Sequence, residues 1–210
     1  MIRSHPTDQL LVDYATGVLP APPGLVIAAH AETCRACNAR IRQIEQVNGD
    51  LLASLPESSL APDALAQILD RIQHVPLESA RRPSPWSADI PIPEAVARFG
   101  LAPRRWINPS LWISHVRGPR AGGWRTYFVG GAPNARIPAH THNGVELISV
   151  LQGAYHDGQT YSQGDFAQKD RGTEHTQQVG PHGACICLVA SRAPARWRGA
   201  AKFIAPLFYI

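Results

Sequence analysis

The chain has 210 residues, of which 44% are apolar and 17% are charged, and this composition excludes a largely disordered protein. Its longest apolar runs, near residues 25 to 29 and 184 to 190, are far shorter than the roughly 18 residues of a membrane span. The first residues also lack the pattern of a signal peptide, so we expect a cytoplasmic protein with no membrane association.

The net charge of +4 is divided unevenly along the chain. Residues 1 to 78 contain five arginines and nine acidic residues, a net charge of −4, and the rest contain fifteen basic and seven acidic residues, a net charge of +8. An acidic first part attracts a basic partner protein and is repelled by DNA. The basic residues of the second part are scattered, so we expect no direct binding of nucleic acid.

The first 75 residues are predicted to be helical. Thr7 is placed to cap a helix that begins at residue 8 and ends before Gly17. Further helices are expected over residues 23 to 30, from residue 34 to about 55 with Thr33 as the cap, and from about 63 to 74. The last helix has an apolar stripe, which packs on its own domain or lies against a partner: Leu65, Ile68, Leu69 and Ile72.

Prolines at five positions between residues 76 and 93 interrupt any regular structure and predict a linker. Beyond it, short segments rich in β-branched and aromatic residues alternate with turn residues, near 111 to 116, 124 to 129, 146 to 151 and 184 to 190. This pattern predicts an antiparallel β-sandwich or barrel. The fold class is therefore multidomain, with a helical domain over residues 1 to 75, a linker over 76 to 93 and an all-β domain over 94 to 210.

A first group of metal-ligand residues lies in the helical part. His30, Cys34 and Cys37 stand at positions i, i+4 and i+7, so their side chains can converge on one ion. A closed zinc site needs a fourth protein ligand, and the candidates are His5, His74 and several carboxylates. We favour His5, because a helix starting near residue 7 can fold back across the cysteine pair. The alternatives are that both cysteines are ordinary buried residues, or that they form a redox pair, although no βαβ pattern surrounds them.

These residues resemble the zinc-binding anti-sigma domain family, whose H-x3-C-x2-C core is present from His30 to Cys37. The family also has an upstream histidine, which corresponds to His5. The resemblance implies a domain that binds a bacterial sigma factor of the extracytoplasmic-function group and keeps it from RNA polymerase.

A second group of metal-ligand residues lies in the β part. His140, His142 and Glu146 are followed by Gly153, in the pattern H-x-H-x3-E-x6-G, and His175 comes later in the chain. The two histidines share one face of a strand, because side chains alternate with a period of two. Glu146 follows a turn, and Gly153 marks a hairpin. Three histidines and one glutamate suit zinc, iron, manganese or nickel, and ligand type does not choose among these metals.

The pattern is similar to the two-part cupin motif, with three departures, none of them at a ligand. Asn134 stands where the motif has glycine, Asp170 where proline is common, and Val179 where asparagine is common. A zinc anti-sigma domain followed by a cupin resembles the ChrR family of anti-sigma factors over the whole chain. The family implies zinc in both domains, held by His5, His30, Cys34 and Cys37 and by His140, His142, Glu146 and His175. It also implies that singlet oxygen or a related oxidant frees the sigma factor.

Cys185 and Cys187 share one face of a predicted strand near the second metal site. Buried packing is the simpler interpretation for such cysteines, and oxidation during signalling is the functional one.

We therefore expect a zinc-dependent anti-sigma factor rather than an enzyme. The alternative is a metal-dependent cupin enzyme, a dioxygenase or an isomerase, with the helical part as an oligomerisation arm. Against this alternative, no acid-base residue is recognisable beyond the ligands. A DNA-binding zinc module is disfavoured by the acidic first half.

Overall fold

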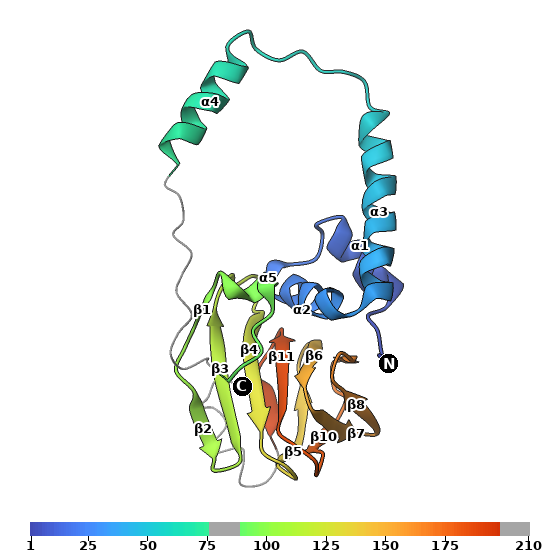
Figure 1. Ribbon diagram of the computed structural model, residues 1–210, viewed down its shortest axis with the longest axis vertical. Coiled ribbons are helices and arrows are strands. Elements are labelled where there is room, and N and C mark those ends of the chain that lie inside the picture. The colour runs from blue at the N-terminus through green and yellow to red at the C-terminus, as the bar shows by residue number, and fades with distance from the viewer. Residues whose placement is uncertain (76–88, 198–210) are drawn as a thin grey trace.

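A computed structural model describes residues 1 to 75 and 89 to 197 of the chain. Most of the predicted linker and the last thirteen residues of the predicted β domain lie outside these ranges. The described part consists of helices that precede a two-layered β-sandwich (Figure 1). Within it, no helix is both long enough and apolar enough to cross a membrane.

Four helices form the first part: α1 (Asp8–Ala15), α2 (Ala21–Thr33), α3 (Arg35–Ala53) and α4 (Ala64–His74). Thr7 caps α1 as predicted, since its side chain accepts a hydrogen bond from the Leu10 backbone N–H. The second helix begins two residues earlier than predicted. Its first turn accommodates Pro22 and Pro23, because N–H groups there have no partner within the helix.

The junction between α2 and α3 also differs from the prediction. Thr33 remains in α2, where its hydroxyl donates to the carbonyl of His30, and Cys34 rather than Thr33 is the residue that caps α3. The backbone N–H of Cys34 donates to the carbonyl of His30. This tight junction brings His30 and Cys34 together at the start of α3.

Within the described residues 89 to 197, the sandwich contains twelve short strands in two antiparallel sheets. The larger sheet has the order β1-β3-β4-β11-β6-β9, with β2 also paired to β3. Its strands are β1 (Gly100–Leu101), β2 (Arg105–Asn108), β3 (Leu111–Arg117), β4 (Arg125–Gly131), β6 (Glu146–Gln152), β9 (Phe166–Lys169) and β11 (Cys185–Ser191). A short helix, α5 (Glu94–Ala97), precedes β1.

The smaller sheet has the order β12-β5-β10-β7-β8. Its strands are β5 (Arg136–His142), β7 (Ala154–Asp157), β8 (Gln159–Ser162), β10 (His175–Val179) and β12 (Ala195–Trp197). The chain crosses from one sheet to the other between β5 and β6, and again between β6 and β7. The prediction of a hairpin at Gly153 is therefore wrong. Gly153 has a φ of 72° and lies against the Ala184 carbonyl, which leaves no room for a side chain at this corner.

Strand β11 explains the long apolar run that the sequence contains. Cys185, Cys187 and Val189 face the interior between the sheets, and Ile186, Leu188 and Ala190 face the helices. Every residue of β11 is buried, because both faces of this strand are covered.

Helix α2 lies on the outer face of the larger sheet (Figure 1). Val26, Ile27, Phe128 and Leu188 are fully buried in one hydrophobic cluster that runs from the helices into the sheet. Apolar residues surround most of α2, as expected for a helix that is covered on several sides. The helical part and the sandwich therefore share a core, even though their residue patterns predict two separate domains.

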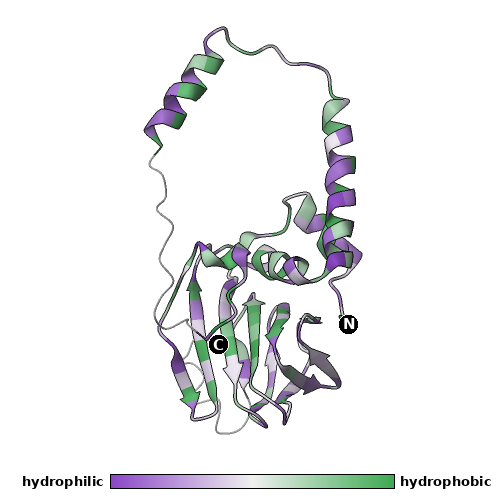
Figure 2. Ribbon diagram, in the orientation of Figure 1, coloured by the Kyte–Doolittle hydropathy of each residue, from purple (hydrophilic) through white to green (hydrophobic). Residues whose placement is uncertain are grey.

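The end of α3 and all of α4 project away from this body (Figure 1). Helix α4 has no buried residue, and in α3 only Cys37 and Ile41 are buried. Apolar stripes are visible along both helices in Figure 2. The exposed apolar residues of these two helices, named here the α3–α4 surface, are Val47, Leu51, Leu52, Leu65, Ile68, Leu69 and Ile72.

Candidate metal centres

The first metal-ligand cluster joins three elements of the helical part. His30 comes from the last turn of α2, Cys34 from the junction, and Cys37 from the first turn of α3, while His5 precedes α1. The ligand atoms of these four residues all lie within 4.8 Å of one another. Cys34 Sγ and Cys37 Sγ lie 3.3 and 3.4 Å from His5 Nδ1, and His30 Nε2 lies 3.3 Å from Cys37 Sγ.

The chemistry of this cluster suits a divalent cation. Burial, and then the nearby His5, lower the pKa of His30 to about 4, so its imidazole is neutral and has a free lone pair. Burial and the adjacent Cys34 raise the pKa of Cys37 to about 12, because two thiolates side by side repel each other without a cation between them. Two sulfurs and two imidazole nitrogens are a donor set for tetrahedral zinc.

His74, the other histidine weighed as a fourth ligand, is not part of this cluster. It lies exposed at the end of α4, where Asp70 is its partner. The structure thus brings together His5 and the three residues of the sequence motif, as the fold-back of the first helix predicts.

The second metal-ligand cluster lies inside the sandwich and is fully buried. His140 and His142 come from β5, Glu146 begins β6, and His175 begins β10. The ligand atoms of these residues also lie within 4.8 Å of one another. The His142 and His175 Nε2 atoms are 3.0 Å apart, and Glu146 Oε2 lies 3.4 Å from His142 Nε2.

Hydrogen bonds on the outer side of this cluster turn two histidines towards its centre. His140 Nδ1 lies 2.9 Å from the Pro138 carbonyl oxygen and donates to it, which leaves Nε2 as the free lone pair. His175 Nδ1 donates to Asp157 Oδ2 at 2.9 Å, and Lys169 Nζ lies 2.8 Å from the same oxygen. A carboxylate behind a histidine is the usual support of a metal ligand.

The charges in the second cluster are also those of a cation site. Burial lowers the pKa of His140 to about 4, so this imidazole is neutral. For Glu146, burial opposes ionisation, but the hydrogen bond and charge of His142 outweigh it and hold the pKa below its usual value. The ring nitrogens of His142 and His175 converge with this carboxylate. A divalent ion fits this donor set.

The indole of Trp197 on β12 covers one side of the cluster. Its ring stacks on the His140 imidazole at a centroid distance of 4.6 Å and an angle of 22°. Asn134, where the cupin motif has glycine, adopts a φ of 63° at the turn before β5. Asparagine is one of the few other residues that tolerate this left-handed conformation, so the turn is preserved.

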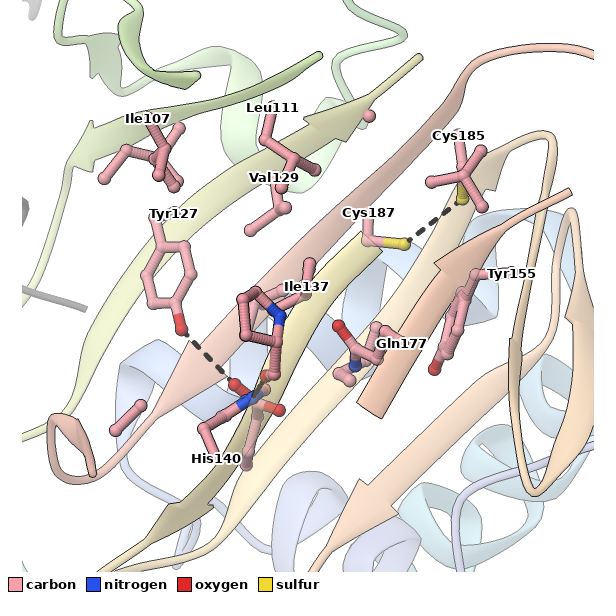
Figure 3. A pocket seen from close by; sticks show the side chains of 18 of the residues that line it. Ile107, Leu111, Tyr127, Val129, Ile137, His140, Tyr155, Gln177, Cys185 and Cys187 are labelled. Carbon is pink, nitrogen blue, oxygen red and sulfur yellow. Dashed lines mark hydrogen bonds between the residues drawn. The ribbon is translucent and has the colours of Figure 1, made fainter. Parts of the chain in front are cut away.

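Cys185 and Cys187 lie on β11 and face the interior of the sandwich (Figure 3). Their sulfur atoms are 3.7 Å apart. The hydrogen bond with Cys185, together with burial, raises the pKa of Cys187 well above its ordinary value. This thiol is therefore protonated at neutral pH, which disfavours it as a resting nucleophile.

Strand β9 connects the surroundings of the two clusters. At one end, the Phe166 N–H donates to the Ser4 carbonyl, next to His5, and the Phe166 ring lies edge-on to the His30 ring at 5.7 Å. At the other end, Lys169 holds Asp157 behind His175. A short strand therefore touches supporting groups of both clusters.

Asp165, just before β9, fastens the N-terminal segment to the sandwich. Its Oδ1 accepts hydrogen bonds from the backbone N–H groups of Arg3 and Ser4 at 2.7 and 3.1 Å, and its Oδ2 accepts from Ser162 at 2.8 Å. Burial opposes ionisation, yet these three donors hold the pKa of Asp165 below its usual value. Sequence inspection gives no sign of this role, because it depends on contacts across some 160 residues.

We expect Asp165→Ala to lower the free energy of unfolding by about 3 kcal/mol at neutral pH, because three N–H groups lose a charged acceptor. Since the folded pKa of Asp165 is depressed, its stabilisation is present above the unfolded pKa and is lost as pH falls through the folded pKa. The difference between wild type and variant should therefore shrink in acid. Denaturant unfolding at several pH values measures it, and a difference that grows on acidification would contradict this account.

The fold and the two clusters define a class of protein, in which a helical region with a His/Cys cluster precedes a cupin-like sandwich with a His/Glu cluster. The family model described as the ChrR cupin-like domain matches residues 102 to 195. The chain is 33% identical to the anti-sigma-E factor ChrR of Cereibacter sphaeroides, over 100% of this chain and 99% of that protein. The crystal structure of Rhodobacter sphaeroides SigE in complex with the anti-sigma ChrR matches with a TM-score of 0.72 and 26% identity, over 91% of this chain and 100% of the matched chain.

The chain therefore belongs to the ChrR family of anti-sigma factors. Its role is regulatory, and the alternative of a cupin dioxygenase or isomerase is set aside because the likeness to an anti-sigma factor extends over the full length.

Proposed function

We propose that this protein is a zinc-dependent anti-sigma factor that sequesters an extracytoplasmic-function sigma factor in the cytoplasm and releases it under oxidative stress. The observation that carries the proposal is the full-length likeness to ChrR, which was solved in complex with SigE. The organisation proposed is a helical anti-sigma domain over residues 1 to 75, a linker over 76 to 93 and a cupin domain over 94 to 210.

The α3–α4 surface supports binding of a partner protein through the helical part. Leu51, Leu65 and Ile68 are 62%, 69% and 51% exposed, and other apolar side chains of the two helices are similarly open. Exposed apolar stripes of this kind on a folded protein often mark a site of protein–protein interaction. The net charge of −4 over residues 1 to 78 favours a partner with a basic surface.

Both clusters are proposed to hold zinc. In the first, His5, His30, Cys34 and Cys37 form a closed set of four ligands that joins α2, α3 and the segment before α1, and the role is structural. In the second, His140, His142, Glu146 and His175 hold an ion beside an interior cavity, and the role is detection. Singlet oxygen or a related oxidant is the proposed signal, and Cys185 and Cys187 are the candidate sites of modification.

The contacts of β9 offer a route from detection to release. A change at His175 would affect Asp157 and then Lys169, which lies at one end of β9. At the other end of β9, Phe166 is hydrogen-bonded to Ser4 and packs on His30. Release then requires that the oxidised protein binds the sigma factor less tightly than the resting protein does.

Transcription in a purified system is the direct test of the proposed function. RNA polymerase core enzyme, the extracytoplasmic-function sigma factor encoded with this protein and a cognate promoter should give transcripts that the zinc-loaded protein suppresses. A primary sigma factor with its own promoter is the control and should be unaffected. Full transcription by every co-encoded sigma factor of this group, in the presence of folded and metal-loaded protein, would contradict the proposal.

We expect Asp157→Asn to lower the zinc affinity of the second cluster by ten- to a hundredfold, because the amide supports the His175 ring less well than a carboxylate does. The first cluster should keep its zinc. Competition with a chromophoric chelator measures both sites, and Asp170→Asn, an exposed change in the neighbouring loop, is the matched control. Equal zinc affinities in the two variants would show that Asp157 does not support the site.

A further inference from the structure

A cavity of about 270 Å³ lies between the two sheets. His140, His142 and Glu146 of the second cluster form part of its wall. Protein interiors are close-packed and hold few voids larger than a water molecule. A cavity of roughly 150 Å³ is already large enough to bind benzene. The space beside the second cluster is therefore large enough for an organic molecule rather than for an ion and water alone.

Most of the cavity wall is apolar. Aliphatic side chains of the larger sheet form it, among them Ile107, Leu111, Ile113, Val129, Ile148 and Val189. In Figure 3, Ile107, Leu111 and Val129 lie together on one side of the space, and His140 and Gln177 lie on the other. Water bound along such an aliphatic wall would lack hydrogen-bond partners, so the body of an occupant should be apolar.

Tyr155 on β7 supplies an independent sign of a ligand. It lines the cavity and is only 4% exposed, and its hydroxyl has no hydrogen-bond partner within the part of the chain that the structure describes. Burial raises the pKa of Tyr155 well above its usual value, so the hydroxyl keeps its proton and is a donor. A buried donor without an acceptor is unusual in a folded protein, and an acceptor oxygen on an occupant of the cavity would satisfy it.

The mouth of the cavity is marked by the residues of its wall that are partly open to solvent. Ile107 and Asn108 on β2 and Ile137 and Pro138 on β5 are exposed or half-buried, whereas the wall residues of β6 and β11 are buried. A ligand would therefore enter between β2 and β5 and extend inward past the second cluster.

We propose that this cavity binds a small amphiphilic carboxylate, with its apolar body against the aliphatic wall and its carboxylate directed to the second cluster and the Tyr155 hydroxyl. This inference rests on the proposed metal in that cluster but not on the identity of the sigma factor. Three neutral imidazoles, one carboxylate and a divalent cation carry a net charge of +1, which an anionic head group balances. A zinc site with four ligands can expand to five.

Calorimetric titration of the full-length, zinc-loaded protein tests the inference. The probes are straight-chain carboxylates from hexanoate to dodecanoate, each compared with the alcohol of the same length. We expect the affinity to rise with chain length, to pass through an optimum and to fall once the chain exceeds the cavity. The alcohol should bind at least tenfold more weakly than the carboxylate of the same length. Equal binding of the two would overturn the proposed position of the head group.

Two substitutions in the cavity wall separate its apolar and polar parts. Val129→Phe fills the space and should weaken binding at least tenfold, and the same substitution at exposed Val47 is the matched control. Tyr155→Phe removes only the unpartnered hydroxyl and should weaken binding about fivefold, the usual effect of one hydrogen bond. Unchanged affinity in Val129→Phe, with normal thermal unfolding, would place the binding elsewhere and overturn the inference.

Zinc content and inhibition of transcription are measured on the same wild-type preparation. If both are normal and no carboxylate binds, only the ligand inference fails. If the second cluster holds no metal, the proposed function fails at that point, whatever the titration shows.

Discussion

Replacing Ile68 with glutamate should weaken sigma factor binding by about 2 to 4 kcal/mol, roughly thirty- to several-hundredfold, which is the effect of removing a central apolar anchor from an interface. Ile68 lies in the middle of the α4 stripe and is 51% exposed, so the change removes no buried residue from the described part of the chain. Glutamate is also a better helix former than isoleucine, and α4 itself should persist.

Gln67→Glu is the matched control, because it adds the same charge one residue away on the opposite face of α4. It should bind the sigma factor almost as well as wild type. Leu51→Glu makes the corresponding change on α3. Surface plasmon resonance against the immobilised sigma factor measures all three. If Ile68→Glu and Leu51→Glu bind normally, the α3–α4 surface is not the sigma-binding surface.

Replacing Cys37 with serine should remove the zinc of the first cluster and abolish inhibition of transcription. Apparent binding energies of structural zinc are about 10 to 16 kcal/mol in small zinc domains, so its loss should loosen the junction of α2 and α3. We expect native mass spectrometry to find about two zinc ions per chain in the wild type and about one in this variant.

Cys185→Ser is the control for loss of a cysteine outside the two clusters, and it should keep both metal ions. Circular dichroism reports whether helical structure decreases in Cys37→Ser alone. Retention of both ions in Cys37→Ser would contradict the assignment of this residue as a ligand.

The residues of the two clusters could be predicted from sequence because local geometry decides most of them. Spacings of four and three residues bring His30, Cys34 and Cys37 together across a helix junction, and alternation along β5 directs His140 and His142 to one side. His5 needed one further assumption, that α1 folds back. The four ligand atoms of each cluster converge as these patterns predict.

The supporting residues could not be predicted in this way, because their roles depend on distant pairings. Asp157 reaches His175 only because β7 and β10 are neighbours, and Asp165 contacts Arg3, which lies 162 residues away along the chain. The cavity is formed by side chains from both sheets, so no single segment indicates it. The hairpin predicted at Gly153 was wrong for a similar reason, since a glycine with positive φ serves a hairpin and a corner between sheets equally well.

The fastening of Arg3 and Ser4 by Asp165 limits how far this protein can be treated as modular. His5 follows directly after that fastened segment. One of the four residues of the first cluster is therefore positioned by the sandwich and not by the helices alone. A chimaera that joins residues 1 to 75 to another C-terminal domain would lose this anchor unless the new domain supplies an equivalent carboxylate. Exchange of the C-terminal domain among such regulators, in the laboratory or in evolution, should therefore succeed only when the turn before β9 is kept together with the helices.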